Sequence, residues 1–221
     1  MRILIVEDQT MFRELLAAAC AQVVEQADLR LAADGAAALV ACRSCAPDLV
    51  VLDLELPDID GLDLLGELRM LAPRLRVIVL SSHTDEFSLH RATLAQVNGF
   101  VDKDGQPVVI LAEAIREVSA GRQYLSPIVH QVKLAMRNDP AAFNKVLTDR
   151  EVEMLALIGA GAPDDEIAAR FSLRPITVKN HRRNILSKLG LHSTPDLMRY
   201  ALEKGFVRIR RRRPPAVAPA P

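Results

Sequence analysis

Hydrophobic and polar residues alternate in blocks over the first half of the chain. Short segments with strand patterns lie near 2–6, 28–33, 48–53, 76–81 and 99–102, and most of them are continuous apolar runs rich in Val, Ile and Leu. Such runs are typical of strands buried on both faces of a parallel sheet. Between them, apolar residues recur at helical spacing near 10–22, 35–45, 61–71, 85–95 and 107–120. This alternation predicts an α/β unit with helices on both faces of the sheet.

The second half of the chain has a different pattern. In residues 122–145, Ser126-Pro127 can open a short helix and Asn138-Asp139-Pro140 should end it, which is typical of a linker. Helical spacing then dominates near 149–160, 164–171, 175–188 and 194–204. The last residues are basic and then rich in Pro and Ala, a composition typical of disorder. We predict an α/β domain, a linker, an all-α domain and a tail, with limits at 1–121, 122–145, 146–207 and 208–221.

Charged residues lie where the predicted strands end. Glu7 and Asp8 follow the first strand, Asp53 ends the third, and Lys103 follows the fifth. The carboxyl ends of parallel strands meet at one edge of an open sheet, where such folds bind ligands. Clustered carboxylates repel one another unless a cation lies among them, and Mg²⁺ suits carboxylates together with phosphate oxygens. A carboxylate can also accept a phosphoryl group as a nucleophile.

These residues, with Pro57, Gly61 and Ser81, resemble the receiver domain of two-component response regulators over roughly residues 1–121. The resemblance implies a flavodoxin-like, doubly wound, five-stranded parallel sheet. It also implies that a partner sensor histidine kinase phosphorylates Asp53. Asp8 and Asp53 would bind Mg²⁺ directly, Glu7 through water and Glu55 through its backbone carbonyl. Lys103 and the Ser81 hydroxyl would bind phosphate oxygens, and Ser81 with Phe100 would form a switch pair that alters the face of helix 85–95.

The second half resembles the LuxR-type helix-turn-helix of NarL-like regulators over about residues 145–206. The resemblance lies in Leu147-Thr148-Asp149-Arg150-Glu151 and in the segment from Thr177 to Ile185. Thr148 is a plausible N-cap with Glu151 at the capping-box position. The resemblance to this family implies a dimer that binds a promoter element with two half-sites.

The segment from Thr177 to Ile185 is the expected recognition helix. We expect an apolar stripe made by Ile176, Val178, Ile185 and Leu189. Lys suits guanine edges and Asn suits adenine, so Lys179 and Asn180 are the predicted base contacts. The predicted backbone contacts are Thr177, Arg182 and Arg183.

Three features leave alternatives open. Asp164-Asp165 stand where the family has a polar pair, and these acids can cap the helix yet repel phosphate. Arg174 replaces the family's capping Ser or Thr before Pro175, so a cap is lost. In helix 194–204, the apolar stripe Leu197, Met198, Ala201 and Leu202 fits either core packing or the pairing of two DNA-binding domains.

Composition narrows the function classes. Residues 1–121 carry 10 Lys and Arg against 19 Asp and Glu, and the remainder carry 18 against 9, so the second half suits a polyanion. No apolar stretch reaches the ~18 residues of a membrane span, and we expect a cytoplasmic protein without membrane association. Cys42 and Cys45 have CxxC spacing without a second pair, which favours two small helix residues over a redox or zinc site.

The sequence therefore predicts a DNA-binding response regulator with Mg²⁺ as cofactor and no conventional enzyme activity. One rival is a phosphorelay or protein-binding adaptor whose helix-turn-helix does not read DNA. Another is DNA binding that does not depend on phosphorylation. A redox regulator that uses Cys42 and Cys45 is a third.

Overall fold

The computed structural model of the chain describes residues 1–104 and 107–207, and the predicted tail 208–221 lies outside these residues. The chain forms two compact units, which divide between Pro140 and Ala141. No helix in the described ranges is both long and apolar enough to cross a bilayer.

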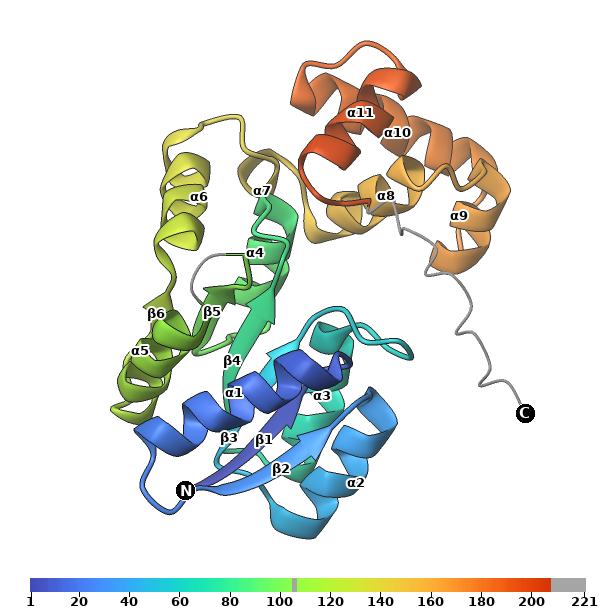
Figure 1. Cartoon of the computed structure of the whole chain (residues 1–221). Helices are drawn as coiled ribbons and strands as arrows, with labels where there is room; N and C mark the ends of the chain where they lie inside the picture. The colour runs from blue at the N-terminus through green and yellow to red at the C-terminus, as the bar shows by residue number, and fades with distance from the viewer. Residues whose placement is uncertain (105–106, 208–221) are drawn as a thin grey trace, which may run out of the picture. The chain divides into compact units, whose positions relative to one another are not determined.

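The first unit is built on one parallel sheet (Figure 1). Its strands are β1 (Arg2–Val6), β2 (Asp28–Ala32), β3 (Leu49–Asp53), β4 (Arg76–Ser81), β5 (Gly99–Asp102) and β6 (Tyr124–Leu125). They run in the order β2-β1-β3-β4-β5-β6, and every pairing is parallel. The predicted fold class is confirmed, but the predicted number of five strands was wrong. The sixth strand has only two residues, which is too short to show an apolar pattern.

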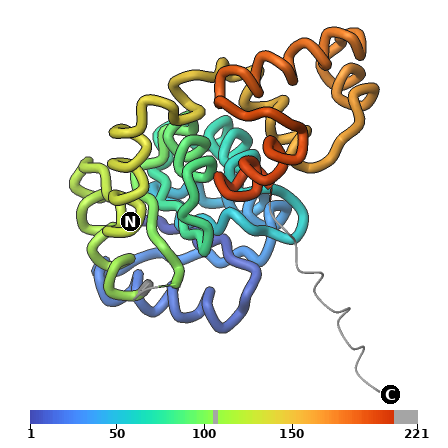
Figure 2. The backbone as a smooth tube through the Cα atoms, turned by 90° about the horizontal axis from the view of Figure 1, so that it is seen from above, coloured from blue at the N-terminus to red at the C-terminus, as the bar shows by residue number. Residues whose placement is uncertain are grey.

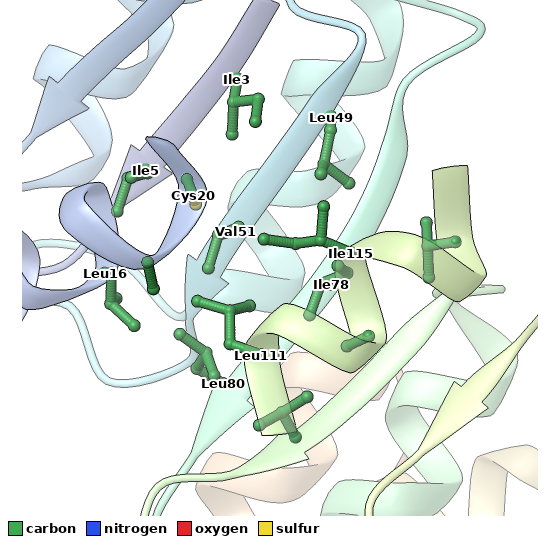
Figure 3. Packing of buried hydrophobic residues seen from close by; sticks show 14 residues of the cluster. Ile3, Ile5, Leu16, Cys20, Leu49, Val51, Ile78, Leu80, Leu111 and Ile115 are labelled. Atoms are coloured by element: carbon green, nitrogen blue, oxygen red, sulfur yellow. The ribbon is translucent and has the colours of Figure 1, made fainter. Parts of the chain in front are cut away.

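Two helical layers cover this sheet. One face carries α1 (Thr10–Val23) and α5 (Pro107–Ser119). The other carries α2 (Gly35–Cys45), α3 (Gly61–Leu71) and α4 (Glu86–Leu94). Alternate residues of the central strands face the first layer, so that Ile5, Val51 and Leu80 pack against Leu16 of α1 and Leu111 of α5 (Figure 3). This core fixes the strand register, and with it the edge where the strands end.

The predicted linker contains regular structure. After β6 the chain forms α6 (Pro127–Asn138), which can be followed in Figures 1 and 2 and packs against α4. Ser126 is its N-cap residue and the helix ends at Asn138, as the Ser-Pro and Asn-Asp-Pro signals predict. Val129 and Met136 are buried. Residues 127–138 therefore belong to the first unit, and α7 (Phe143–Val146) to the second.

All the regular secondary structure in the described residues of the second unit is helical. After α7 come α8 (Asp149–Gly159), α9 (Asp164–Phe171), α10 (Pro175–Leu189) and α11 (Thr194–Glu203). Thr148 and Glu151 form the predicted capping box at the start of α8. In α11, Leu197 and Ala201 are buried in the core, whereas Met198 is 40% and Leu202 47% exposed. The apolar stripe of α11 is thus divided between the core and the surface.

Candidate functional site

The predicted acidic pocket forms at the carboxyl edge of the sheet. Glu7 and Asp53 are buried, Asp8 is half-buried, and their carboxylate oxygens lie within 4.8 Å of one another. Lys103 reaches this group from the end of β5, and its Nζ donates to Glu7 Oε2 and lies 2.8 Å from Asp53 Oδ2. The order of the strands explains why these side chains lie together. β1 and β3 are neighbours, so Glu7, Asp8 and Asp53 lie side by side, and Lys103 follows β5 at the same carboxyl edge.

Burial shapes the charge balance of this pocket. Burial raises the pKa of the Glu7 carboxyl, the neighbouring Asp53 raises it further, and Lys103 opposes both. Burial lowers the pKa of Lys103, but the carboxylates of Asp53 and Glu7 outweigh that effect and the pKa ends above its ordinary value. The ammonium thus stays charged because two carboxylates flank it. The pocket holds more negative charge than one lysine balances, a composition suited to a cation.

Ser81 and Phe100 are both buried beside this edge. The Ser81 hydroxyl oxygen accepts from the backbone N–H of His83 at 2.9 Å. A hydroxyl that accepts one hydrogen bond can still donate its own proton to another group. His83 Nε2 lies 2.6 Å from the Glu55 carboxylate, whose residue also donates its backbone N–H to Asp53 Oδ1 at 3.0 Å. Glu55, Ser81 and Asp53 are therefore brought together.

The loop after Asp53 is held by contacts that the sequence did not reveal. Asp58 accepts from the first backbone N–H groups of α2, those of Gly35 and Ala36, both at 3.0 Å. The Asp60 carboxylate accepts hydrogen bonds from the two terminal guanidinium nitrogens of Arg91 in α4, at 2.8 and 2.9 Å. Asp60 before Gly61 is a recognisable capping signal, but nothing in the sequence marks its partner Arg91. The loop is fixed to α2 on one side and to α4 on the other.

Gly61 lets the start of α3 approach the end of β3 closely. A Cβ at this position would lie 2.3 Å from the Asp53 carbonyl oxygen and 2.9 Å from Leu54 Cα. Both neighbours are backbone atoms, which cannot turn aside as a flexible side chain can. Glycine is required here for close approach of two backbone segments.

In the second unit, α10 presents polar residues on its surface. Lys179, Asn180 and Arg183 are exposed, whereas Thr177 and Arg182 are half-buried. Val178 and Ile185 are buried in the core and Leu189 is half-buried, as the predicted stripe requires. Ile176, which we expected in the same stripe, is 61% exposed, so this part of the prediction was wrong. Residues two apart on a helix do not share a face, which separates Ile176 from Val178.

Near α9 and α10 the sequence differs from the family pattern at Asp164-Asp165 and at Arg174, and the structure shows what each difference does. Arg174 is the N-cap residue of α10 and makes no side-chain capping bond, so the predicted loss of a cap is confirmed. Pro163 is the N-cap residue of α9, so Asp164 and Asp165 lie in its first turn and do not cap it. Asp164 instead accepts from the Arg182 guanidinium of α10, and the two side chains are 22% and 17% exposed.

Sequence comparisons divide the chain along the same lines. Residues 3–115 match the family described as the response regulator receiver domain. Residues 145–201 match the bacterial regulatory proteins of the luxR family. The chain belongs to the luxR-type response regulators. It is therefore a transcriptional regulator with a receiver domain and a DNA-binding domain of the helix-turn-helix class.

Relatives of this response regulator match it over nearly their full length. The transcriptional activator protein ExaE of Pseudomonas putida is 34% identical over 95% of this chain and 99% of its own. The response regulator protein VraR of Staphylococcus aureus is 30% identical over 93% and 98%. Among solved structures, RcsB of Salmonella enterica bound to promoter DNA covers 93% and 98% with a TM-score of 0.65 at 22% identity, which shows a shared fold.

Proposed function

We propose that this response regulator receives a phosphoryl group on Asp53 from a partner sensor histidine kinase. The observation that carries the proposal is Lys103, which lies 2.8 Å from both Asp53 and Glu7 at the carboxyl edge of the sheet. An Asp53 carboxylate oxygen attacks the phosphorus of a phosphohistidine, the O–P bond forms, and the P–N bond breaks. The departing imidazole takes up a proton from solvent water. Lys103 neutralises charge on the transferred group, which is the main contribution that a protein makes to phosphoryl transfer.

A divalent cation fits the same pocket. Carboxylate oxygens of Glu7, Asp8 and Asp53 lie within 4.8 Å of one another, close to the span that a single Mg²⁺ with ligands at about 2.1 Å can bridge. We propose Asp8 and Asp53 as direct ligands, Glu7 as a ligand through water, and the Glu55 carbonyl as a further ligand. Bound Mg²⁺ would supply positive charge opposite the phosphate oxygens. The residues themselves set the acceptor in place.

Ser81 and Phe100 are the proposed switch pair. The Ser81 hydroxyl, which accepts from His83, can donate its proton to a phosphate oxygen on Asp53. Arg91 ties α4 to the loop after Asp53 through Asp60, so a change at the acceptor also reaches α4. We propose that the altered α4 face favours a dimer that binds promoter DNA.

The DNA-binding face of this proposal is α10. Lys179 and Asn180 are the proposed base contacts, and Thr177, Arg182 and Arg183 are the proposed backbone contacts. Exposed Met198 and Leu202 on α11 are suited to pairing two DNA-binding domains. The functional division is then a receiver at 1–121 and a DNA-binding domain at 146–207, acting on DNA in the cytoplasm. We propose phosphoryl acceptance and DNA binding, with no conventional enzyme activity.

Acyl-phosphate formation tests the first step. The full chain is incubated with phosphoramidate and Mg²⁺, and intact mass spectrometry reports the gain of one phosphoryl group. The wild type should gain it and Asp53→Ala should not. The control is Asp28→Ala, which removes an exposed carboxylate from the start of β2, at the opposite end of the strands, and should label normally. An Asp53→Ala protein that labels like the wild type would show that another residue is the acceptor.

A second candidate function is an adaptor whose helix-turn-helix does not read DNA. It is favoured by the ion pair of Asp164 with Arg182, which engages one of the proposed phosphate contacts. Selection of bound sequences from random DNA distinguishes the two functions. A recovered repeated half-site, enriched more strongly with beryllofluoride, supports the regulator. A failure to enrich any sequence in either state supports the adaptor.

A further inference from the structure

Ile176 is an exposed apolar residue in the first turn of α10. Its exposed fraction of 61% is far above those of Val178 and Ile185, which are fully buried. At about 100° per residue, Ile176 lies roughly 180° around the helix from Ile185. The core of the second unit therefore makes no use of this side chain. Its β-branched form also gives α10 no advantage in helix propensity.

The face that carries Ile176 is the face of the proposed base contacts. Residues three and four apart are neighbours on a helix surface, so Ile176 lies beside Lys179 and Asn180. Arg183, two turns on, continues the same face, and all three of these polar residues are exposed. An isolated apolar side chain thus stands among the charged and amide groups that are proposed to meet DNA.

The chemistry of the major groove offers one apolar partner. Thymine alone presents a methyl group there, and apolar side chains contact it, whereas the other base edges present hydrogen-bond donors and acceptors. The N-terminal residues of a recognition helix are those that reach base edges. Ile176 is the second residue of α10, and its apolar side chain suits van der Waals contact with a methyl group.

We propose that Ile176 contacts the 5-methyl group of a thymine in each half-site and thereby selects thymine at that position. This inference rests on the proposed reading of DNA by α10. Lys179 and Asn180 would supply the hydrogen bonds of the half-site, and Ile176 would distinguish thymine from cytosine, which lacks the methyl group. Binding should therefore depend on one carbon atom of the DNA.

A paired change in protein and DNA isolates this contact. Sequences are first selected from random DNA with the full chain and beryllofluoride. Each thymine of the recovered half-site is then replaced singly by deoxyuridine, which lacks only the methyl group, and affinity is measured by fluorescence anisotropy. Loss of one buried methyl group corresponds to about a fourfold loss of affinity. At one position per half-site, deoxyuridine should weaken the wild type by about this factor.

Variants of the protein, measured on the same two DNAs, complete a double-mutant cycle between Ile176 and the thymine methyl group. Ile176→Ala should lose about the same factor on thymine DNA and should show no further loss on deoxyuridine DNA. Ile176→Val, which retains a branched apolar side chain, should still distinguish the two DNAs. Met70→Ala removes a similarly exposed apolar side chain from α3 of the receiver and should behave as the wild type. Thermal melting of each variant should be unchanged, because Ile176 and Met70 lie outside the cores.

The possible failures are distinguishable. A wild type that binds thymine and deoxyuridine DNA equally at every position overturns the Ile176 contact and leaves DNA reading intact. The same is true if Ile176→Ala retains the full loss on deoxyuridine, because another side chain then meets the methyl group. If no sequence is enriched at all, the proposed function of α10 fails and the Ile176 contact fails with it.

Discussion

Replacing Asp164 by Asn should strengthen DNA binding. Asp164 lies in the first turn of α9 and pairs with Arg182, one of the proposed phosphate contacts of α10. In helix-turn-helix proteins the helix before the recognition helix crosses the DNA backbone, so a carboxylate there faces phosphate. Asn removes the negative charge and the competition for Arg182 while it preserves the size of the side chain. Both side chains are partly exposed, so loss of the pair should cost about 1 kcal/mol of stability or less.

The size of the effect follows from counterion release. One additional phosphate contact steepens the plot of log affinity against log salt concentration by about 0.9. Between 50 and 200 mM salt, the advantage of Asp164→Asn over the wild type should therefore shrink by about 3.5-fold. A gain of about tenfold at 50 mM corresponds to about 1.4 kcal/mol, the scale of one charge-assisted hydrogen bond.

A salt titration of affinity decides the matter. The full chain and its variants bind a fixed duplex in fluorescence anisotropy over a range of salt concentrations. Asp165→Asn is the matched control, because Asp165 carries the same charge in the same turn of α9 but is not the residue that holds Arg182. If both variants gain equally with equal slopes, the effect is a general one of net charge. If Asp164→Asn binds more weakly than the wild type, Asp164 orients Arg182 toward DNA and the reasoning is refuted.

Two further predictions concern stability. Gly61→Ala should lower the free energy of unfolding by about 3 kcal/mol in urea denaturation, because the added Cβ meets the Asp53 carbonyl oxygen. Gly66→Ala, with open space around it, should raise the free energy of unfolding by about 0.5–1 kcal/mol. Equal effects of the two substitutions would contradict the close packing of α3. Burial raises the pKa of Glu151, but hydrogen bonds from Lys188 and Thr148 outweigh that effect, and the pKa ends below its ordinary value of 4.5. The charged Glu151 carboxylate therefore stabilises the fold above pH 4.5, and this stabilisation is lost as the pH falls through the lowered pKa. Glu151→Gln should therefore cost about 1 kcal/mol at pH 7 and progressively less toward pH 3 in thermal melting, and a constant difference would show that the charge of Glu151 is not involved.

The sequence predicted most of this architecture for local reasons. The runs that form β1, β3, β4 and β5 are largely buried, so their apolar composition alone separates them from the helices. The edge strand β2 is mostly exposed. The pocket of Glu7, Asp53 and Lys103 was predictable because parallel strands end at one edge. Thr148 with Glu151 was predictable because both partners lie within one turn.

What the sequence left out depends on distant partners. β6 is defined by backbone pairing with β5 and has no side-chain pattern of its own. The pair of Arg91 with Asp60 joins α4 to the residue before α3, and nothing in the sequence near either one marks the other. Ile176 was placed in the core because its apolar character was read without its angle around the helix. A residue two positions from buried Val178 has to lie on another face.

In both proposed sites a basic side chain that is expected to meet phosphate is paired with carboxylate. Lys103 is bound by Glu7 and Asp53, and Arg182 by Asp164. The Lys103 side chain is 10% exposed, so solvent ions screen its pairs little, and binding of phosphate there depends on chemistry at Asp53 itself. The Arg182 side chain is 17% exposed, so dissolved salt should affect the proposed exchange of Arg182 from Asp164 to a DNA phosphate. Ionic strength should therefore weaken the proposed DNA binding more strongly than it weakens the proposed acyl-phosphate formation, so that the two proposed functions can be distinguished in one preparation.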